Sequence, residues 1–161
     1  MDNEEDSLTK VHIDLPNHWA TGGESMWALP LGNDLYEIRN APFYAYGINW
    51  GDVVRAYPDD PKLKPEVREV VRRSGNKTLR VFFNKELSEE EQNSVLSSLQ
   101  DLDLSWERAT ERLVAIDVHP EANYQAVCDK LWGVEQQGVL EYETCEARVP
   151  NSFDDAPSED E

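Results

Sequence analysis

The spacing of apolar and turn residues changes near Gly75, and this change constrains the fold more than any other feature of the chain. Before Gly75, short apolar runs alternate with turn residues, and helical spacing is nearly absent. The expected strands cover residues 11–15, 25–31, 35–39, 52–56 and 66–72. Several short strands at this spacing predict a small antiparallel sheet or a barrel-like structure.

After Gly75 the pattern alternates between strands and helices. Residues 79–83 alternate as a strand, and Ser88 with Glu91 has the spacing of a capping box at a helix start. Strands at 105–109 and 113–118 follow, joined by a hairpin at 110–112. A second helix after Pro120 and a strand at 140–149 complete the order β-α-β-β-α-β, which predicts a ferredoxin-like arrangement.

The expected fold class is therefore α+β, with a small sheet or barrel followed by a ferredoxin-like part. The predicted segments are a disordered acidic tail (1–8), a small β subdomain (9–75), a ferredoxin-like α/β subdomain (76–149) and a second disordered acidic tail (150–161). In such an arrangement both helices cover one face of the sheet. The other face mixes apolar and acidic residues, so we expect the N-terminal sheet or a partner to cover part of it.

Acidic residues are concentrated in the second part. Residues 7–84 contain nine acids and ten bases, whereas residues 85–149 contain fifteen acids and five bases, within a net charge of −18 for the chain. A field of this sign repels nucleic acid and anionic membranes and attracts basic partners. We therefore expect neither direct nucleic-acid binding nor membrane association.

The N-terminal segment and the cysteine count indicate the cellular compartment. It begins with neither a basic nor an apolar segment, which argues against a secretory signal. Cys128 and Cys145 are too few for a disulfide framework and are interpreted as buried thiols in a reducing environment. We expect a cytoplasmic protein.

No motif predicts catalysis. The segment Gly75 to Thr78 resembles the end of a phosphate loop, but a strand follows it rather than a helix, so we interpret it as a turn. Ser25 lacks the frame of a nucleophile elbow. The histidines His12, His18 and His119 lack metal-ligand spacing. We expect no enzyme, no metal and no cofactor.

Two further segments have alternative interpretations. Residues 40–52 are the densest aromatic stretch, which is either a binding loop or, as we favour, a hydrophobic connection that seals the small sheet. A basic run could form a phosphate groove, but pairing with the acidic second part is the favoured interpretation. Its members are Lys62, Lys64, Arg68, Arg72, Arg73, Lys77 and Arg80.

Four segments carry a family resemblance. They are residues 24–32, 41–47, 51–54 and 74–80. These strings resemble the bacterial domain-of-unknown-function family 4265, over roughly residues 10–148. The resemblance implies a small bacterial cytoplasmic protein and assigns no activity or catalytic residue. The acidic ends depart from what the family leads us to expect.

The leading hypothesis is an acidic protein that neutralises a basic protein partner. Its main form is an immunity protein against a bacterial toxin, and a variant of it is a nucleic-acid mimic. Acids steer such an encounter and buried aromatics supply affinity. The predicted partner-binding residues are Phe82, Trp106, Glu107, Glu111, Asp117, Glu141 and Glu143. The alternative is a small-molecule-binding regulatory module without catalysis, supported by analogy between folds alone.

Overall fold

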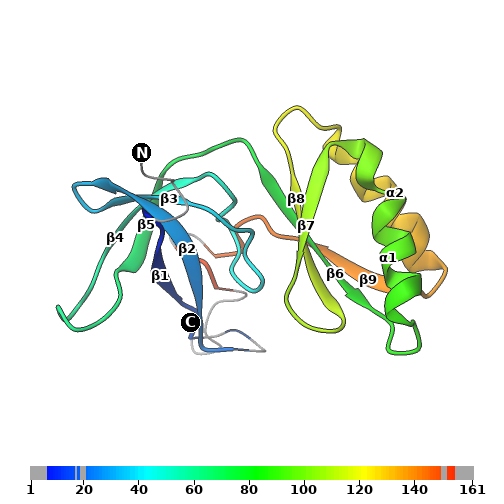
Figure 1. Cartoon of the computed structure of the whole chain (residues 1–161), viewed down its shortest axis with the longest axis horizontal. Helices are drawn as coiled ribbons and strands as arrows, with labels where there is room; N and C mark the ends of the chain where they lie inside the picture. Colours follow the sequence, from blue (N-terminus) through cyan, green and yellow to red (C-terminus); the bar gives the residue numbers. More distant parts are fainter. Residues whose placement is uncertain (1–6, 17, 19–20, 150–151, 155–161) are drawn as a thin grey trace.

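The computed structural model describes residues 7–16, 18, 21–149 and 152–154. Two parts lie side by side: a five-stranded closed barrel, and a four-stranded sheet with two helices (Figure 1). Each part has its own cluster of buried apolar residues. The expected α+β class with a barrel-like first part is confirmed.

The barrel is built from sequential hairpins. Its strands are β1 (Thr9–Asp14), β2 (Gly23–Gly32), β3 (Leu35–Ile38), β4 (Val53–Tyr57) and β5 (Glu66–Arg72). Successive strands pair antiparallel, and a parallel contact between His12 and Glu66 closes the barrel. Alternation places one set of side chains inside, for example Val11 and Ile13 of β1, which are fully buried.

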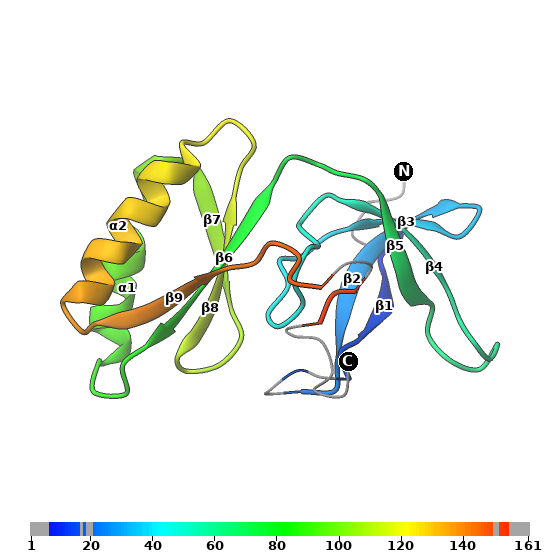
Figure 2. The same cartoon turned by 180° about the vertical axis from the view of Figure 1, so that it is seen from behind.

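The second part follows the predicted order. Its elements are β6 (Lys77–Phe83), α1 (Glu89–Ser97), the short 3-10 helix η2 (Gln100–Leu102), β7 (Leu104–Arg108), β8 (Leu113–Val118), α2 (Tyr124–Gln136) and β9 (Leu140–Thr144). The strands form an antiparallel sheet in the order β7-β8-β6-β9, with both helices on one face (Figure 2). Within the described residues, neither helix has the length and apolar character that a membrane crossing requires.

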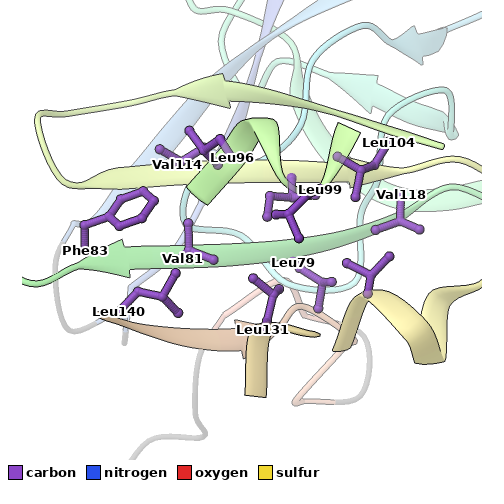
Figure 3. Close-up of a cluster of buried hydrophobic side chains, with 12 residues drawn as sticks. Leu79, Val81, Phe83, Leu96, Leu99, Leu104, Val114, Val118, Leu131 and Leu140 are labelled. Atoms are coloured by element: carbon purple, nitrogen blue, oxygen red, sulfur yellow. The ribbon is translucent and has the colours of Figure 1, made fainter. Parts of the chain in front are cut away.

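The core of this part lies between the sheet and the helices (Figure 3). Leu79, Val81 and Phe83 of β6 project toward Leu96 of α1 and Leu131 of α2, and all five are buried. Burial of a side chain of this size contributes roughly 1.5–3 kcal/mol. Alternation along β6 therefore fixes which side chains are left for the opposite face.

The start of each helix is fixed by side-chain capping. The predicted capping box is present, because the Ser88 hydroxyl accepts from the backbone N–H of Glu91 and the Glu91 carboxylate accepts from that of Ser88. α2 begins after Asn123, whose side chain accepts from the N–H of Ala126. The second helix therefore starts later than Pro120.

The chain crosses between the two parts twice. After β9 it runs back to the barrel (Figure 2), and the N–H of Gly47 donates to the carbonyl of Cys145. Phe153 then packs against the barrel core, and Asp154 is buried. The prediction of a disordered tail from residue 150 is thus wrong for residues 152–154, because an aromatic side chain anchors this segment. Residues 1–6, 150, 151 and 155–161 of the predicted tails lie outside the described part.

Candidate functional site: the sheet face between the two parts

The face of the second sheet opposite the helices lies toward the barrel (Figure 1). Strand register aligns Glu107, Ala115, Arg80 and Glu143 in one row across this face. The neighbouring row is Leu113, Phe82 and Glu141, and Asp117 lies on the other side, opposite Thr78. Five of the seven predicted partner-binding residues share this face: Phe82, Glu107, Asp117, Glu141 and Glu143.

Trp106 is on the opposite face, away from the five residues above. It pairs with Ile116 and packs against the core under the helices. Consecutive residues of a strand point to opposite faces, so Trp106 and Glu107 cannot contact the same partner surface.

The centre of the face is held by Arg80. This side chain is 2% exposed and donates to Glu143 at 2.9 Å and to the carbonyl of Ala45 at 2.8 Å. The same Glu143 accepts from the Tyr46 hydroxyl at 2.8 Å and pairs with Arg148 at 3.3 Å. Burial raises the pKa of the Tyr46 hydroxyl, so it stays a donor. Glu143 is therefore engaged within the chain, and its predicted role in partner binding stays a prediction.

The aromatic segment 40–52 is the layer between barrel and sheet. Glu24 of β2 is buried and accepts backbone N–H groups from Phe43 at 2.6 Å, Tyr44 at 3.1 Å and Ala45 at 2.9 Å. Tyr46 and Ile48 are buried as well. These contacts agree with the favoured interpretation of a sealing connection.

Beside this layer lies a hollow of about 320 Å³ at the barrel-facing end of β7 and β8. Its lining consists of Trp50, Asn76, Ser105, Glu107, Asp117, His119 and Pro120. Asp117 accepts from the amide of Asn76 at 2.9 Å, while Glu107 accepts only a 3.4 Å contact from the N–H of Ala41. Burial raises the pKa of both carboxyl groups. Neither forms an ion pair with a lysine or arginine of the described part.

A chain of three polar side chains borders the hollow. Asp103 contacts Nδ1 of His119 at 2.8 Å, and Nε2 of His119 lies 3.3 Å from the Ser105 hydroxyl. This is the order of a Ser-His-Asp triad. However, Asp117 is 3.7 Å from the same Nε2, and its charge opposes an oxyanion formed near Ser105. The arrangement fits an imidazole held between carboxylates better than an activated nucleophile.

The far end of the face is uncovered. Phe82 is 40% exposed, Leu113 is half-buried beside it, and Glu141 is exposed. Arg112 lies over the Phe82 ring at 4.2 Å from its centre, and the neighbouring Glu111 is exposed in the β7–β8 hairpin. Phe82, Glu111 and Glu141 are thus accessible, as predicted residues of a binding surface must be.

The basic run does not pair with the acids of the second part as expected. Arg68 pairs with Asp59 at 2.8 Å and Glu66 at 2.9 Å, and Arg73 pairs with Asp52. All of these partners belong to the barrel part. Of the run's described ion pairs, only that of Arg80 reaches an acid of residues 85–149, and Arg80 lies in the same sheet as Glu143. Arg68 and Arg73 thus pair with acids of the barrel part rather than with acids of the second part.

Metal-binding chemistry has no assembled donor set in the part of the chain that is described, where no group of three or more His, Cys, Asp or Glu side chains could hold an ion. Cys145 is buried, and burial raises its pKa to about 12, so it stays a thiol.

Sequence reasoning did not single out Trp50, Asn76, Ser105 or His119 as members of one site. Trp50 lies in the aromatic segment, which was the only available signal. The other three come together because β8 and the turn before β6 meet beside β7.

Comparison with known proteins identifies the family and the fold. No curated protein matches the chain. A crystal structure of a hypothetical protein from Neisseria gonorrhoeae is similar with a TM-score of 0.73 and 13% identity, over 86% of this chain and 94% of that one. At this identity the similarity concerns the fold alone. The family described as "Domain of unknown function (DUF4265)" matches residues 24–142, and the chain belongs to that family, as the four sequence segments predicted.

Proposed function

We propose that the protein neutralises a basic protein partner, with an immunity protein against a bacterial toxin as the specific form and the cytoplasm as its place of action. The observation that carries the proposal is the state of the acids of residues 85–149. Ten of them are exposed and form no ion pair with a described basic residue: Glu86, Glu89, Glu90, Glu91, Asp101, Glu111, Glu121, Asp129, Glu141 and Glu146.

Among the described contacts, Glu91 caps α1 and Asp129 accepts from Gln125, while the other eight acids have no side-chain hydrogen bond to lose when a ligand binds. They raise the rate of encounter with a cationic surface, and their effect falls as salt screens it. Exposed Phe82, with half-buried Leu113 beside it, supplies apolar contact area next to Glu141. Occlusion of a cationic active site or nucleic-acid groove by such a surface requires shape and charge but no catalytic group.

We also propose that the second part is ferredoxin-like. The support is the element order β6-α1-β7-β8-α2-β9 together with the sheet order β7-β8-β6-β9. Two crossover helices on one face of an antiparallel sheet are typical of the split β-α-β arrangement.

The test is affinity capture from an extract of the source bacterium at low and high salt, with mass-spectrometric identification and then a direct affinity measurement on the purified partner. We expect a basic protein to be retained at low salt and released at high salt. The quadruple variant Glu111→Gln, Glu121→Gln, Glu141→Gln and Glu146→Gln should weaken that affinity about tenfold or more.

A matched control removes four barrel acids that already have partners: Glu37→Gln, Asp59→Asn, Glu66→Gln and Glu69→Gln. This control has the same net charge as the test variant. Equal loss of affinity in both variants would show that bulk charge alone is responsible. Failure to retain any basic protein at low salt would refute the proposal.

A further inference from the structure

We infer that the outer edge of β7 is a docking site for an extended basic segment of a partner protein, which adds to the sheet as an antiparallel strand. This inference rests on the proposed function and names how the basic partner is bound. Addition of an extended segment to an exposed sheet edge is a common mode of protein recognition.

The sheet has two outer strands, β7 next to β8 and β9 next to β6 (Figure 3). In an antiparallel pair, alternate residues turn their backbone groups toward the neighbouring strand. The N–H of Ala109 donates to the carbonyl of Leu113, so the odd-numbered residues of β7 face β8. The backbone N–H and C=O groups of Leu104, Trp106 and Arg108 therefore point away from the sheet.

The two edges differ in how such outward groups are occupied. On β9 the N–H of Tyr142 donates to the Glu135 carboxylate at 2.9 Å, so a side chain of α2 takes the position of a strand carbonyl. On β7, no described residue accepts from the N–H of Leu104, Trp106 or Arg108. Natural proteins usually cap or cover a sheet edge, because an open edge pairs with other chains. The open edge of this sheet is β7.

The charge around β7 specifies a basic occupant. Residues 101–111 contain four acids and one base, Arg108. Arg108 is held within the chain, since it donates to Gln92 at 2.7 Å and to the carbonyl of Glu111 at 2.9 Å. The carboxylate of Glu107 accepts only a 3.4 Å contact from the N–H of Ala41. An incoming strand thus meets acids that no described lysine or arginine neutralises.

Alternation assigns a chemical role to each position of the incoming strand. Ser105 and Glu107 occupy non-hydrogen-bonded positions of the new pair, where facing side chains are closest. A lysine or arginine opposite Glu107 therefore pairs with it. Trp106 is half-buried on the other face, and an apolar residue opposite it covers more of the indole. The two faces of one added strand reach both Trp106 and Glu107, which a single flat partner surface cannot.

A second copy of this chain is a poor occupant of the edge. With two β7 strands paired antiparallel in register, or shifted by two residues either way, Asp103, Ser105 or Glu107 lies opposite Glu107, and a base never does. Two chains of net charge −18 also repel each other. A basic segment of a different protein is therefore the occupant that the charges favour.

The experiment is an NMR titration of the ¹⁵N-labelled full chain with the peptide acetyl-Val-Lys-Val-Lys-Val-Lys-amide. We expect saturable shifts and slower hydrogen exchange at the amides of Trp106 and Arg108, and neither effect at Tyr142. The same peptide with N-methylated valines should bind about tenfold more weakly. The reason is that residues opposite Trp106 donate their N–H groups to β7, and N-methylation removes those donors.

Arg108→Pro removes an outward N–H and no hydrogen bond to β8, and an edge strand tolerates proline on its solvent side. Thr144→Pro is the matched control, because Thr144 ends β9 and its N–H also points outward. Arg108→Pro should weaken peptide binding about tenfold, although it removes a positive charge, and Thr144→Pro should leave binding unchanged. Glu107→Gln should weaken binding about fivefold and Glu141→Gln should not. This second pair of variants carries the test if a proline variant fails to fold.

Three results would show attraction by charge alone and overturn the docking site. They are equal binding of the N-methylated peptide, equal shifts along β9, and equal weakening by Glu107→Gln and Glu141→Gln. Lack of saturation up to about 10 mM peptide would overturn it as well. Dimerisation of the full chain that Arg108→Pro abolishes, measured by analytical ultracentrifugation, would assign the edge to a second copy instead.

The captured partner separates this inference from the proposed function. If Arg108→Pro binds the captured basic protein with unchanged affinity, strand addition at β7 is wrong and the proposed function stands. If no basic protein is captured, the proposed function is refuted, and the peptide titration alone decides whether β7 accepts a basic strand.

Discussion

The barrel part and the second part use acidic residues in opposite ways. Of the nine acids in residues 7–84, five pair with arginines: Glu37, Asp52, Asp59, Glu66 and Glu69. Of the fifteen acids in residues 85–149, only Glu143 does so among the described contacts. Net charge alone does not explain this difference. Whether an acid forms an ion pair depends on which basic side chains the fold places near it.

The two buried acids of the first part have structural roles. Glu24 accepts hydrogen bonds from three backbone N–H groups of the aromatic segment, and Asp52 accepts them from the N–H groups of Asn49 and Ser74. In the second part Glu107 and Asp117 are also withdrawn from water, but their hydrogen bonds are fewer or longer. The first part therefore uses its buried acids to fix loops through backbone N–H groups, whereas Asp117 is held by the side chains of Asn76 and His119.

The largest expected effect is at the junction of the parts. Arg80→Ala leaves Glu143 and the carbonyls of Pro42 and Ala45 without their buried donor. Glu143 keeps Tyr46 and Arg148, so the cost comes mainly from the buried carbonyls left without a donor, about 1–3 kcal/mol for each. Urea denaturation should therefore show a free energy of unfolding lower by about that amount.

Arg55→Ala is the control for this prediction. Arg55 and Glu69 form an exposed pair at 3.8 Å, and such pairs contribute about 0–1 kcal/mol. A similar loss in both variants would mean that Arg80 is no more important than a surface ion pair.

The next largest effect tests the structural role of barrel acids. Glu24→Gln replaces one acceptor oxygen by an amide that faces backbone N–H groups of segment 43–45. Leaving buried donors unsatisfied costs about 1–3 kcal/mol. Compared with the unsubstituted protein, the variant should show faster hydrogen exchange at the amides of Phe43 and Ala45 and unchanged exchange in α2. Unchanged exchange at these amides would show that the loop does not depend on Glu24.

The order of elements could be predicted from the sequence because each element carries a local signal. Alternation in residues 79–83 and the Ser88–Glu91 capping box both lie within a few residues. The closure of the barrel could not be predicted, since it depends on one parallel contact between His12 and Glu66, far apart in the chain. The packing of Phe153 against the barrel core could not be predicted for the same reason, because it joins residues far apart in the chain.

The candidate site was harder to predict, since it depends on sidedness and on distant neighbours. Glu141 and Phe82 were correctly expected on the accessible surface. Trp106 lies on the helix-covered face, because it pairs with Ile116 and alternates with Glu107 along β7. The contacts of Glu143 could not be predicted, because Arg80 and Tyr46 are 63 and 97 residues away in the chain.

Exposed acids give a smaller effect, with opposite signs in the two parts. Neutralising Glu111, Glu121, Glu141 and Glu146 to Gln removes like-charge repulsion and should raise the Tm by a few degrees at low salt, about 1 kcal/mol or less. Neutralising Glu37 and Glu69 removes arginine partners and should lower it slightly. Calorimetry at two salt concentrations measures both changes in Tm. If both sets of substitutions change the Tm in the same direction, the proposed difference between the two parts is wrong.

The smallest effect concerns the pH dependence of stability at the hollow. Burial raises the folded-state pKa of Glu107 and Asp117 above that of an unfolded chain, so the folded state holds their protons more tightly. The resulting stability is fully present below the unfolded pKa and is lost as pH rises through the folded pKa. Glu107→Gln should remove part of this loss and raise the Tm by about 1–3 °C at pH 7, with little change at acidic pH. Glu111→Gln serves as the reference. If Glu107→Gln instead lowers the Tm at pH 7, the carboxylate of Glu107 already has a stabilising partner in the folded protein.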